Sequence, residues 1–172
     1  MAILLALASA ALYGAADFLG GFASRRAPVL SVLVLSQLAS VATVVVALCI
    51  FPAATVHRAD LAWGTIAGLV GGAGLVLFYS GLATGTMSVF APITGVAAIA
   101  IPVLVGLVEG ERPRPAPLAG IVLAAVAVCF VSIAVVPRGA DGRVSLRAAI
   151  SGRELMTALV AGGAFGVFYV AL

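Results

Sequence analysis

The sequence predicts an all-α, multi-pass transmembrane helix bundle, and two observations lead to that fold class. The chain is 64% hydrophobic and only 9% charged, whereas soluble domains carry about 25% charged residues. Residues 61–108 contain no charged side chain. A single helix over that stretch would be about 72 Å long, roughly twice the hydrocarbon thickness of a bilayer. The chain is therefore an integral membrane protein, and this stretch forms two crossings joined by a turn at Thr84–Thr86.

Short charged islands at residues 25–26, 58–60, 109–114 and 138–154, together with that turn, divide the chain into six apolar segments. Each segment is long enough to span a bilayer as a helix. None alternates apolar with polar residues, which excludes a membrane β-barrel. The first segment lacks a preceding basic region, so it is read as a retained helix rather than a secretion signal. The predicted helices are Ala2–Phe22, Val29–Phe51, Leu61–Ala83, Met87–Val108, Pro117–Val136 and Leu155–Leu172.

The charged and metal-binding residue types exclude several functions. All nine basic residues are arginines in predicted loops, where lipid headgroups explain them better than nucleic acid does. The two cysteines are isolated from each other in apolar segments, and such a pair makes neither a disulfide framework nor a metal site. The single histidine, His57, has no predicted role. We therefore expect no cofactor, no metal and no nucleic-acid partner.

A weak internal repeat organises the chain. Leu12-Tyr13-Gly14 matches Ala164-Phe165-Gly166 at an offset of 152 residues. The predicted units are a first five-helix repeat at 1–136, a loop at 137–154 and the first helix of a second repeat at 155–172. An odd number of helices would insert the second copy in inverted orientation, and the offset projects a ten-helix protein of about 290 residues. The 172 residues alone are then expected not to transport, unless two copies pair as an antiparallel dimer.

Two stretches resemble the EamA-type transporters of the drug/metabolite transporter superfamily. They are YGAADFLGG at residues 13–21 and SVFAPITGVAAIAIPVLVGLVEGER at residues 88–112, with the turn Gly110-Glu111-Arg112 as the more specific signal. The chain departs from the family at Tyr13, where members often carry Trp, and at Ala98, where they often carry Pro. The resemblance implies two inverted five-helix repeats and the export or exchange of amino acids, other small metabolites or drugs.

Asp17 is the only charged residue inside an apolar segment, where a carboxylate is costly and marks function by default. Ser9, Tyr13 and Asp17 are four residues apart and share one helix face with Gly20. On one interpretation this face lines a substrate path, and Asp17 binds a proton or a cationic substrate. On the other, Asp17 reaches the interface and pairs with Arg25 or Arg26.

Further candidates lie on the next three helices. Gln37 carries an amide whose donors and acceptor need partners away from lipid. Tyr79 and Ser80 can line the same cavity, although a tyrosine there also suits the interfacial belt. Pro92 frees a backbone carbonyl, which a transporter can use for its substrate, although most such prolines only bend the helix. Glycines on the third helix predict a close-packing surface: Gly64, Gly68 and Gly72, with Gly71 and Gly74 beside them.

Three function classes remain to be compared. A transporter working by alternating access explains the polar faces, the glycines and the repeat together, with proton coupling left open. An enzyme is not expected, because no catalytic pairing occurs at membrane depth. The alternative is a non-catalytic membrane assembly subunit. The expected location is the plasma or inner membrane. The arginine count places the amino terminus outside, whereas the family resemblance implies a cytoplasmic amino terminus, which we favour.

Overall fold

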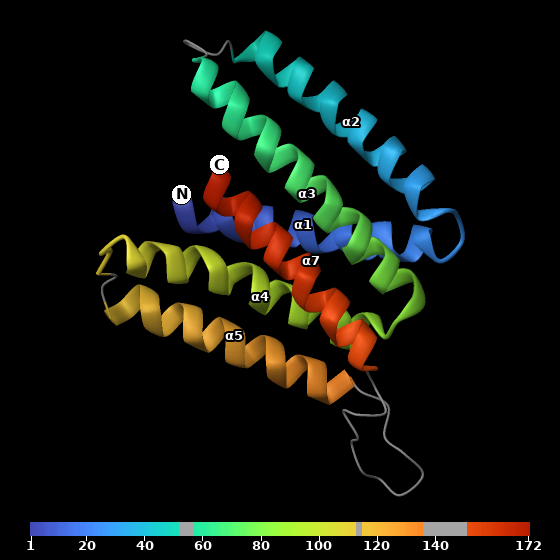
Figure 1. Ribbon diagram of the computed structural model, residues 1–172, viewed down its shortest axis with the longest axis vertical. Coiled ribbons are helices and arrows are strands. Elements are labelled where there is room, and N and C mark those ends of the chain that lie inside the picture. Colours follow the sequence, from blue (N-terminus) through green and yellow to red (C-terminus); the bar gives the residue numbers. More distant parts are fainter. Residues whose placement is uncertain (52–56, 113–114, 136–150) are drawn as a thin grey trace, which may run out of the picture.

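The computed structural model describes residues 1–51, 57–112, 115–135 and 151–172, and the regular secondary-structure elements of these residues are all helices. Figure 1 shows α4 and α5 side by side, with α7 lying across α3 and α4. The all-α multi-pass bundle predicted from the charge spacing is confirmed. The helices are α1 (Ala2–Ser24), α2 (Val29–Ile50), α3 (Arg58–Thr84), α4 (Met87–Val108), α5 (Pro115–Val135) and α7 (Gly152–Ala171).

The observed helices agree with the predicted segments except at their ends. The predicted bounds of α4 are correct, but α3 and α7 each begin three residues earlier than predicted. The Asp60 carboxylate accepts a hydrogen bond from the His57 backbone N–H (2.8 Å) at the start of α3. At the start of α7, the Ser151 hydroxyl accepts from the Glu154 N–H (3.2 Å), and the Glu154 carboxylate accepts from the Ser151 N–H (2.7 Å). These charged residues begin helices because they satisfy backbone donors that have no partner within the helix.

Among the residues that the structure describes, five helices are long and apolar enough to cross a bilayer: α1, α2, α3, α4 and α7. In the same part of the chain, α5 contributes a shorter apolar stretch, Pro115–Val128. Large apolar side chains such as Leu12, Leu35 and Leu69 are more than two-thirds exposed. A soluble protein rarely leaves so much apolar surface uncovered, whereas a bilayer covers it. The chain is therefore a multi-pass membrane protein.

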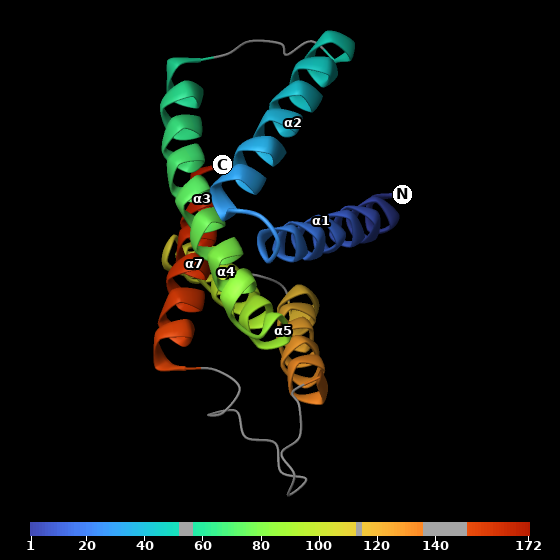
Figure 2. The same cartoon turned by 90° about the vertical axis from the view of Figure 1, so that its right-hand side faces the viewer.

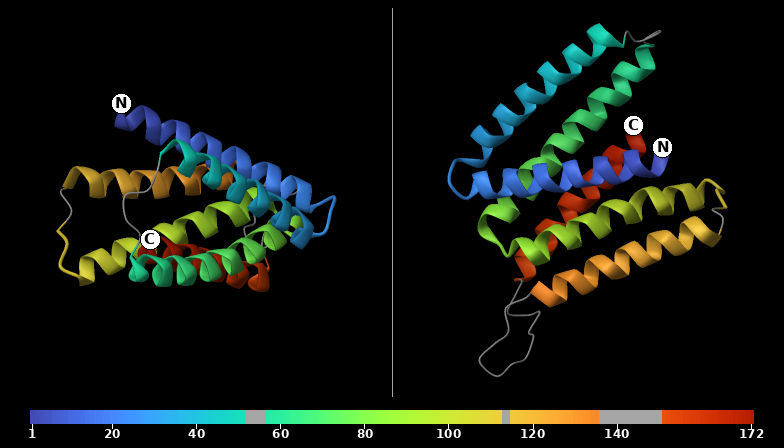
Figure 3. Two further views of the ribbon diagram at one scale, coloured as in Figure 1. Left: turned by 90° about the horizontal axis from the view of Figure 1, so that it is seen from above. Right: turned by 180° about the vertical axis from the view of Figure 1, so that it is seen from behind.

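The most extensive contact between described helices brings α7 against α4. A Cβ atom on Gly162 would lie 2.5 Å from the Thr94 carbonyl oxygen and 2.5 Å from the Ala97 Cβ, and one on Gly166 would lie 2.6 Å from the Ile101 Cβ. Only glycine lets the two helices approach this closely. Figure 3 shows α7 beside α3 and α4.

The glycines of α3 divide between two environments. Gly71 lies against the Phe168 ring and Gly74 against the Phe165 ring, both on α7, with 2.8 and 3.2 Å to the positions of added Cβ atoms. Gly64, Gly68 and Gly72 have no such neighbour within 4 Å among the described residues. The structure therefore shows close packing for the first two glycines, and for the other three close packing stays a prediction. Four-residue spacing identifies a helix face, but it does not identify which face meets another helix.

A small core holds α3, α4 and α7 together near the α3–α4 turn. The Phe78 ring of α3 lies 6.2 Å from the Phe90 ring of α4 and 5.7 Å from the Phe165 ring of α7. Phe90 in turn covers Gly81, where a side chain would collide with the ring. The buried members of this core are Leu33, Phe78, Tyr79, Leu82, Phe90, Ala158 and Ala161.

The helix α4 ends at the Gly110-Glu111 turn. Gly110 has φ +88°, the Glu111 N–H donates to the Gly106 carbonyl (2.8 Å), and the Gly110 N–H donates to the Leu107 carbonyl (3.2 Å). These two bonds with a left-handed residue form a Schellman cap, which favours glycine at that position. Gly106 also leaves space for the Glu111 carboxylate, 2.7 Å from where a Cβ would lie. The turn that carries the family resemblance therefore has a structural role.

Replacing Gly110 with alanine is expected to lower stability by about 1–2 kcal/mol, because an L-residue in the left-handed region clashes with its own carbonyl. The measurement is thermal unfolding of the purified protein in detergent. Gly120→Ala is the matched control, because Gly120 is helical and no neighbouring atom lies within 4 Å of an added Cβ. Equal unfolding midpoints for the two variants would contradict the assignment.

Candidate functional site

The face of α1 that bears Asp17 meets α3 through a glycine. The Tyr79 ring lies where a side chain on Gly20 would be, in direct contact with the α1 backbone. Tyr79 is 7% exposed and Asp17 is partly buried. The two side chains are close enough to interact electrostatically. Gly20 therefore lets the Tyr79 hydroxyl lie one helical turn from the Asp17 position.

The Tyr79 hydroxyl lies within this contact with α1. The Tyr79 ring packs beside the Phe78 ring, whose centroid lies 6.0 Å away. The Tyr79 ring is therefore held between α3 and α1, one helical turn from Asp17.

The arginines at the end of α1 are engaged elsewhere. The Arg25 side chain donates to the Leu82 carbonyl from Nε (3.1 Å) and to the Gly85 carbonyl from Nη2 (2.9 Å). Arg26 lies over the Phe22 ring, 4.4 Å from its centroid. Arginine at the end of a helix binds carbonyls that have no partner within the helix. The described contacts therefore do not support the interpretation in which Asp17 pairs with Arg25 or Arg26.

Tyr169 on α7 is a further residue within electrostatic range of this group, and the sequence analysis did not identify it. It interacts electrostatically with both Asp17 and Tyr13. The Phe165 ring, one turn before it, packs against the Phe78 ring, and the neighbouring Phe168 ring lies 5.3 Å from its own. A signal was available, because the repeat offset that pairs Gly14 with Gly166 also pairs Asp17 with Tyr169.

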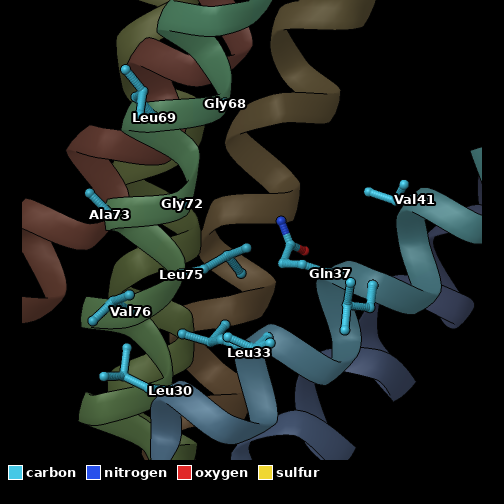
Figure 4. Close-up of a pocket in the computed structure, with 12 residues that line it drawn as sticks. Leu30, Leu33, Gln37, Val41, Gly68, Leu69, Gly72, Ala73, Leu75 and Val76 are labelled. Carbon is cyan, nitrogen blue, oxygen red and sulfur yellow. The ribbon is translucent and has the colours of Figure 1, made fainter.

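Gln37 lies in a separate groove. Figure 4 shows its amide extending from α2 into the space between α2 and α3. The groove has a volume of about 510 Å³, and none of the Asp17 group lines it. Figure 2 shows α2 and α3 diverging toward their far ends, which opens this space. The lining residues are Leu30, Leu33, Val34, Gln37, Leu38, Val41, Gly68, Leu69, Gly72, Ala73, Leu75 and Val76.

Ser80 and Pro92 are not shown in contact with Asp17. The Ser80 hydroxyl donates to the Val76 carbonyl of its own helix (2.6 Å). The helix α4 remains continuous through Pro92 and Pro102. Of the six candidates, Tyr13 and Asp17 therefore share α1, and Tyr79 packs against α1 at Gly20. Tyr169 of α7 is within electrostatic range of Asp17.

The ends of α1, α3 and α7 lie close together at one end of the bundle. Arg25 binds the Gly85 carbonyl from α1, and the Glu154 carboxylate of α7 lies 3.1 Å from where a Cβ on Gly85 would be. The carboxyl end of α1 and the amino end of α7 are therefore on the same side of the bundle. The two helices run in opposite directions (Figure 1).

A bundle of apolar helices with a partly buried carboxylate among tyrosines is typical of a membrane transport protein. The comparison with known families is specific: the model of the EamA-like transporter family matches residues 1–133. The chain belongs to the EamA-like transporter family, which confirms the resemblance to the drug/metabolite transporter superfamily. This family comprises transporters rather than enzymes, and its members work in a lipid bilayer on small molecules. No curated protein and no solved structure matched the chain.

Proposed function

We propose that the protein exports or exchanges a small metabolite, amino acid or drug across the plasma or inner membrane by alternating access, with proton coupling at Asp17. The observation that carries this proposal is the position of Asp17. It is partly buried within a membrane-spanning helix, one turn from the contact of Tyr79 with Gly20, whereas Arg25 is bound to the Leu82 and Gly85 carbonyls. A carboxylate at this depth is costly, so a functional role is the default interpretation.

The surroundings of Asp17 favour proton exchange. The Tyr79 ring of α3 packs on α1 one turn after it, and Tyr169 of α7 is within electrostatic range of it. The described part of α4 carries no ionisable side chain, and α2 contributes only Cys49, near its far end. A carboxyl group without a fixed cation can release its proton when a substrate binds and regain it when the substrate leaves. Proton and substrate then compete for one site, which is the basis of exchange.

The opposite directions of α1 and α7 support the alternating-access part of the proposal. In an inverted repeat, equivalent helices cross the membrane in opposite senses, and the substrate site lies between them. Asp17 on α1 and Tyr169 on α7 occupy equivalent positions at the repeat offset. The pair therefore lies where the two repeats are expected to face the substrate.

The test is flux in reconstituted vesicles, using the product of the complete reading frame. With an imposed pH gradient, a pH-sensitive dye inside the vesicles reports proton movement when amino acids or organic amines are added in turn. Transport predicts proton movement that requires both the protein and a substrate. Absence of flux for every compound in the panel would contradict the proposal.

The second candidate is a membrane assembly subunit, and one observation favours it. Gly64, Gly68 and Gly72 present a small-residue face that no described helix covers. Such faces associate with other helices. Crosslinking through cysteines introduced along this face, combined with absence of flux, would support an assembly role instead of transport.

A further inference from the structure

We infer that the contact between Arg25 and the end of α3 is a latch, which closes one end of the bundle and opens when the protein changes conformation. This inference rests on the proposed transport function and names a part of its gate. The Arg25 guanidinium donates to the Leu82 carbonyl from Nε (3.1 Å) and to the Gly85 carbonyl from Nη2 (2.9 Å). One side chain therefore joins the carboxyl end of α1 to the turn between α3 and α4.

The last turns of α1 pack closely against the same turn. An added Cβ atom on Gly21 would lie 2.6 Å from the Met87 Cε atom and 2.7 Å from the Leu82 Cδ1 atom. The missing side chain lets α1 approach both the end of α3 and the start of α4. Earlier on α1, an added Cβ on Gly14 would meet no described atom within 4 Å, and the Leu12 side chain is exposed. The close contacts therefore lie at the end of α1 where the latch is.

The amino end of α7 reaches the same turn. The Glu154 Oε1 atom lies 3.1 Å from where a Cβ on Gly85 would be, and Arg25 binds the carbonyl of that glycine. In the predicted repeat, α1 begins the first unit and α7 begins the second. Alternating access moves one repeat against the other, so that contacts at one end of the bundle break while those at the other end form. A joint beside Gly85 is therefore placed where a gate is needed.

The joint combines a favourable and an unfavourable contribution to the closed arrangement. The bonds from the Arg25 guanidinium are charge-assisted, and such bonds are stronger than those between neutral groups. The neighbouring Ser24 is 7% exposed, and its hydroxyl is buried without a hydrogen-bond partner in the described part of the chain. A buried, unpaired hydroxyl is destabilising. Closure therefore depends on Arg25, and removing its bonds is expected to open the joint.

The first test measures how fast Ser24→Cys reacts with a water-soluble methanethiosulfonate. It uses the product of the complete reading frame in lipid nanodiscs, with the other cysteines replaced by alanine. Because position 24 is buried while the latch is closed, the reaction reports opening. We expect Arg25→Gln to raise the rate about tenfold, since it removes the charge-assisted bonds. Loss of a neighbouring positive charge by itself slows the reaction of a thiol, so a faster reaction cannot come from the charge alone.

Arg26→Gln is the matched control, because it removes the same charge from the adjacent residue, whose side chain lies over the Phe22 ring. This variant should leave the rate unchanged. Thr94→Cys reports loosening of the whole bundle, because Thr94 is 2% exposed, and it should react slowly in every variant. An unchanged rate at position 24 in Arg25→Gln, or an equal acceleration at position 94, would overturn the inference.

The second test asks whether the joint must open for transport. Gly21→Cys and Met87→Cys in one variant place thiols on the two sides of the joint, and the shorter side chain at 87 leaves space for the one at 21. A short bifunctional methanethiosulfonate should stop vesicle flux, reduction should restore it, and a monofunctional reagent should leave most of it.

The two tests separate the latch from the transport proposal. Flux that persists after complete crosslinking would refute the latch and leave the proposed transport function standing. Faster labelling of Ser24→Cys in Arg25→Gln, in a protein without flux for any compound, would support the movable joint and contradict transport.

Discussion

Asp17→Asn is expected to abolish pH-driven transport by the product of the complete reading frame while leaving its abundance in the membrane unchanged. The amide keeps the shape of the side chain and part of its hydrogen bonding, but it cannot exchange a proton at any physiological pH. Uphill transport against a substrate gradient should therefore disappear, whereas downhill exchange of substrate persists. The measurement is substrate uptake into vesicles with and without an imposed pH gradient.

The matched control is Glu109→Gln, because Glu109 is an exposed acidic residue just beyond the end of α4. This change also removes one negative charge, so it corrects for a general effect of charge on insertion. Transport by Asp17→Asn at the wild-type rate and pH dependence would remove Asp17 from the mechanism. A fall in abundance with intact transport per molecule would instead indicate that Asp17 serves the structure alone.

The helices could be predicted because membrane insertion imposes a simple rule on the sequence. Charged islands must lie outside the hydrocarbon, so their spacing locates the helices, and the bounds of α4 follow without error. The rule fails at the amino ends of α3 and α7. Asp60 and Glu154 interrupt the apolar pattern there, yet they belong to the first turn, where carboxylates satisfy free backbone N–H groups.

The site could be predicted only where it depends on a single helix. Tyr13 and Asp17 share a face because of their four-residue spacing, and the structure keeps them together on α1. The contact of Tyr79 with Gly20 depends on the packing of α1 on α3, which no local pattern encodes. The glycines of α3 also show that a local pattern does not identify the packed helix face. Gly71 and Gly74 contact α7, while Gly64 contacts no other described helix.

The position of Gln37 also shows why polarity is an incomplete guide to a site. An amide in a membrane helix predicts a polar partner. In the structure, however, Gln37 lines the groove between α2 and α3, away from the residues around Asp17. The mutual position of α1, α2 and α3 decides which polar groups meet, and that position depends on tertiary packing. Tyr169 could have been found from the repeat, because symmetry relates positions on different helices.

The contact between α7 and α4 yields the second large prediction, a comparison of two adjacent glycines on α7. Gly162→Ala should lower stability by about 1–3 kcal/mol, because the new Cβ overlaps the Thr94 carbonyl oxygen and the Ala97 Cβ at 2.5 Å. The carbonyl belongs to the backbone of α4 and cannot rotate away. The helix α7 must therefore move away from α4.

Gly163→Ala is the matched control, because its Cβ would lie 3.8 Å from the Ile101 Cδ1 atom, an ordinary van der Waals contact. Alanine also favours a helix over glycine by roughly 0.5–1 kcal/mol, so this variant should be as stable as the wild type or slightly more stable. Thermal unfolding in detergent measures the difference between the two variants. Vesicle flux should fall in Gly162→Ala alone, since only that change separates α7 from α4. Equal stability and equal flux in the two variants would show that the Gly162 contact does not hold α7 in place.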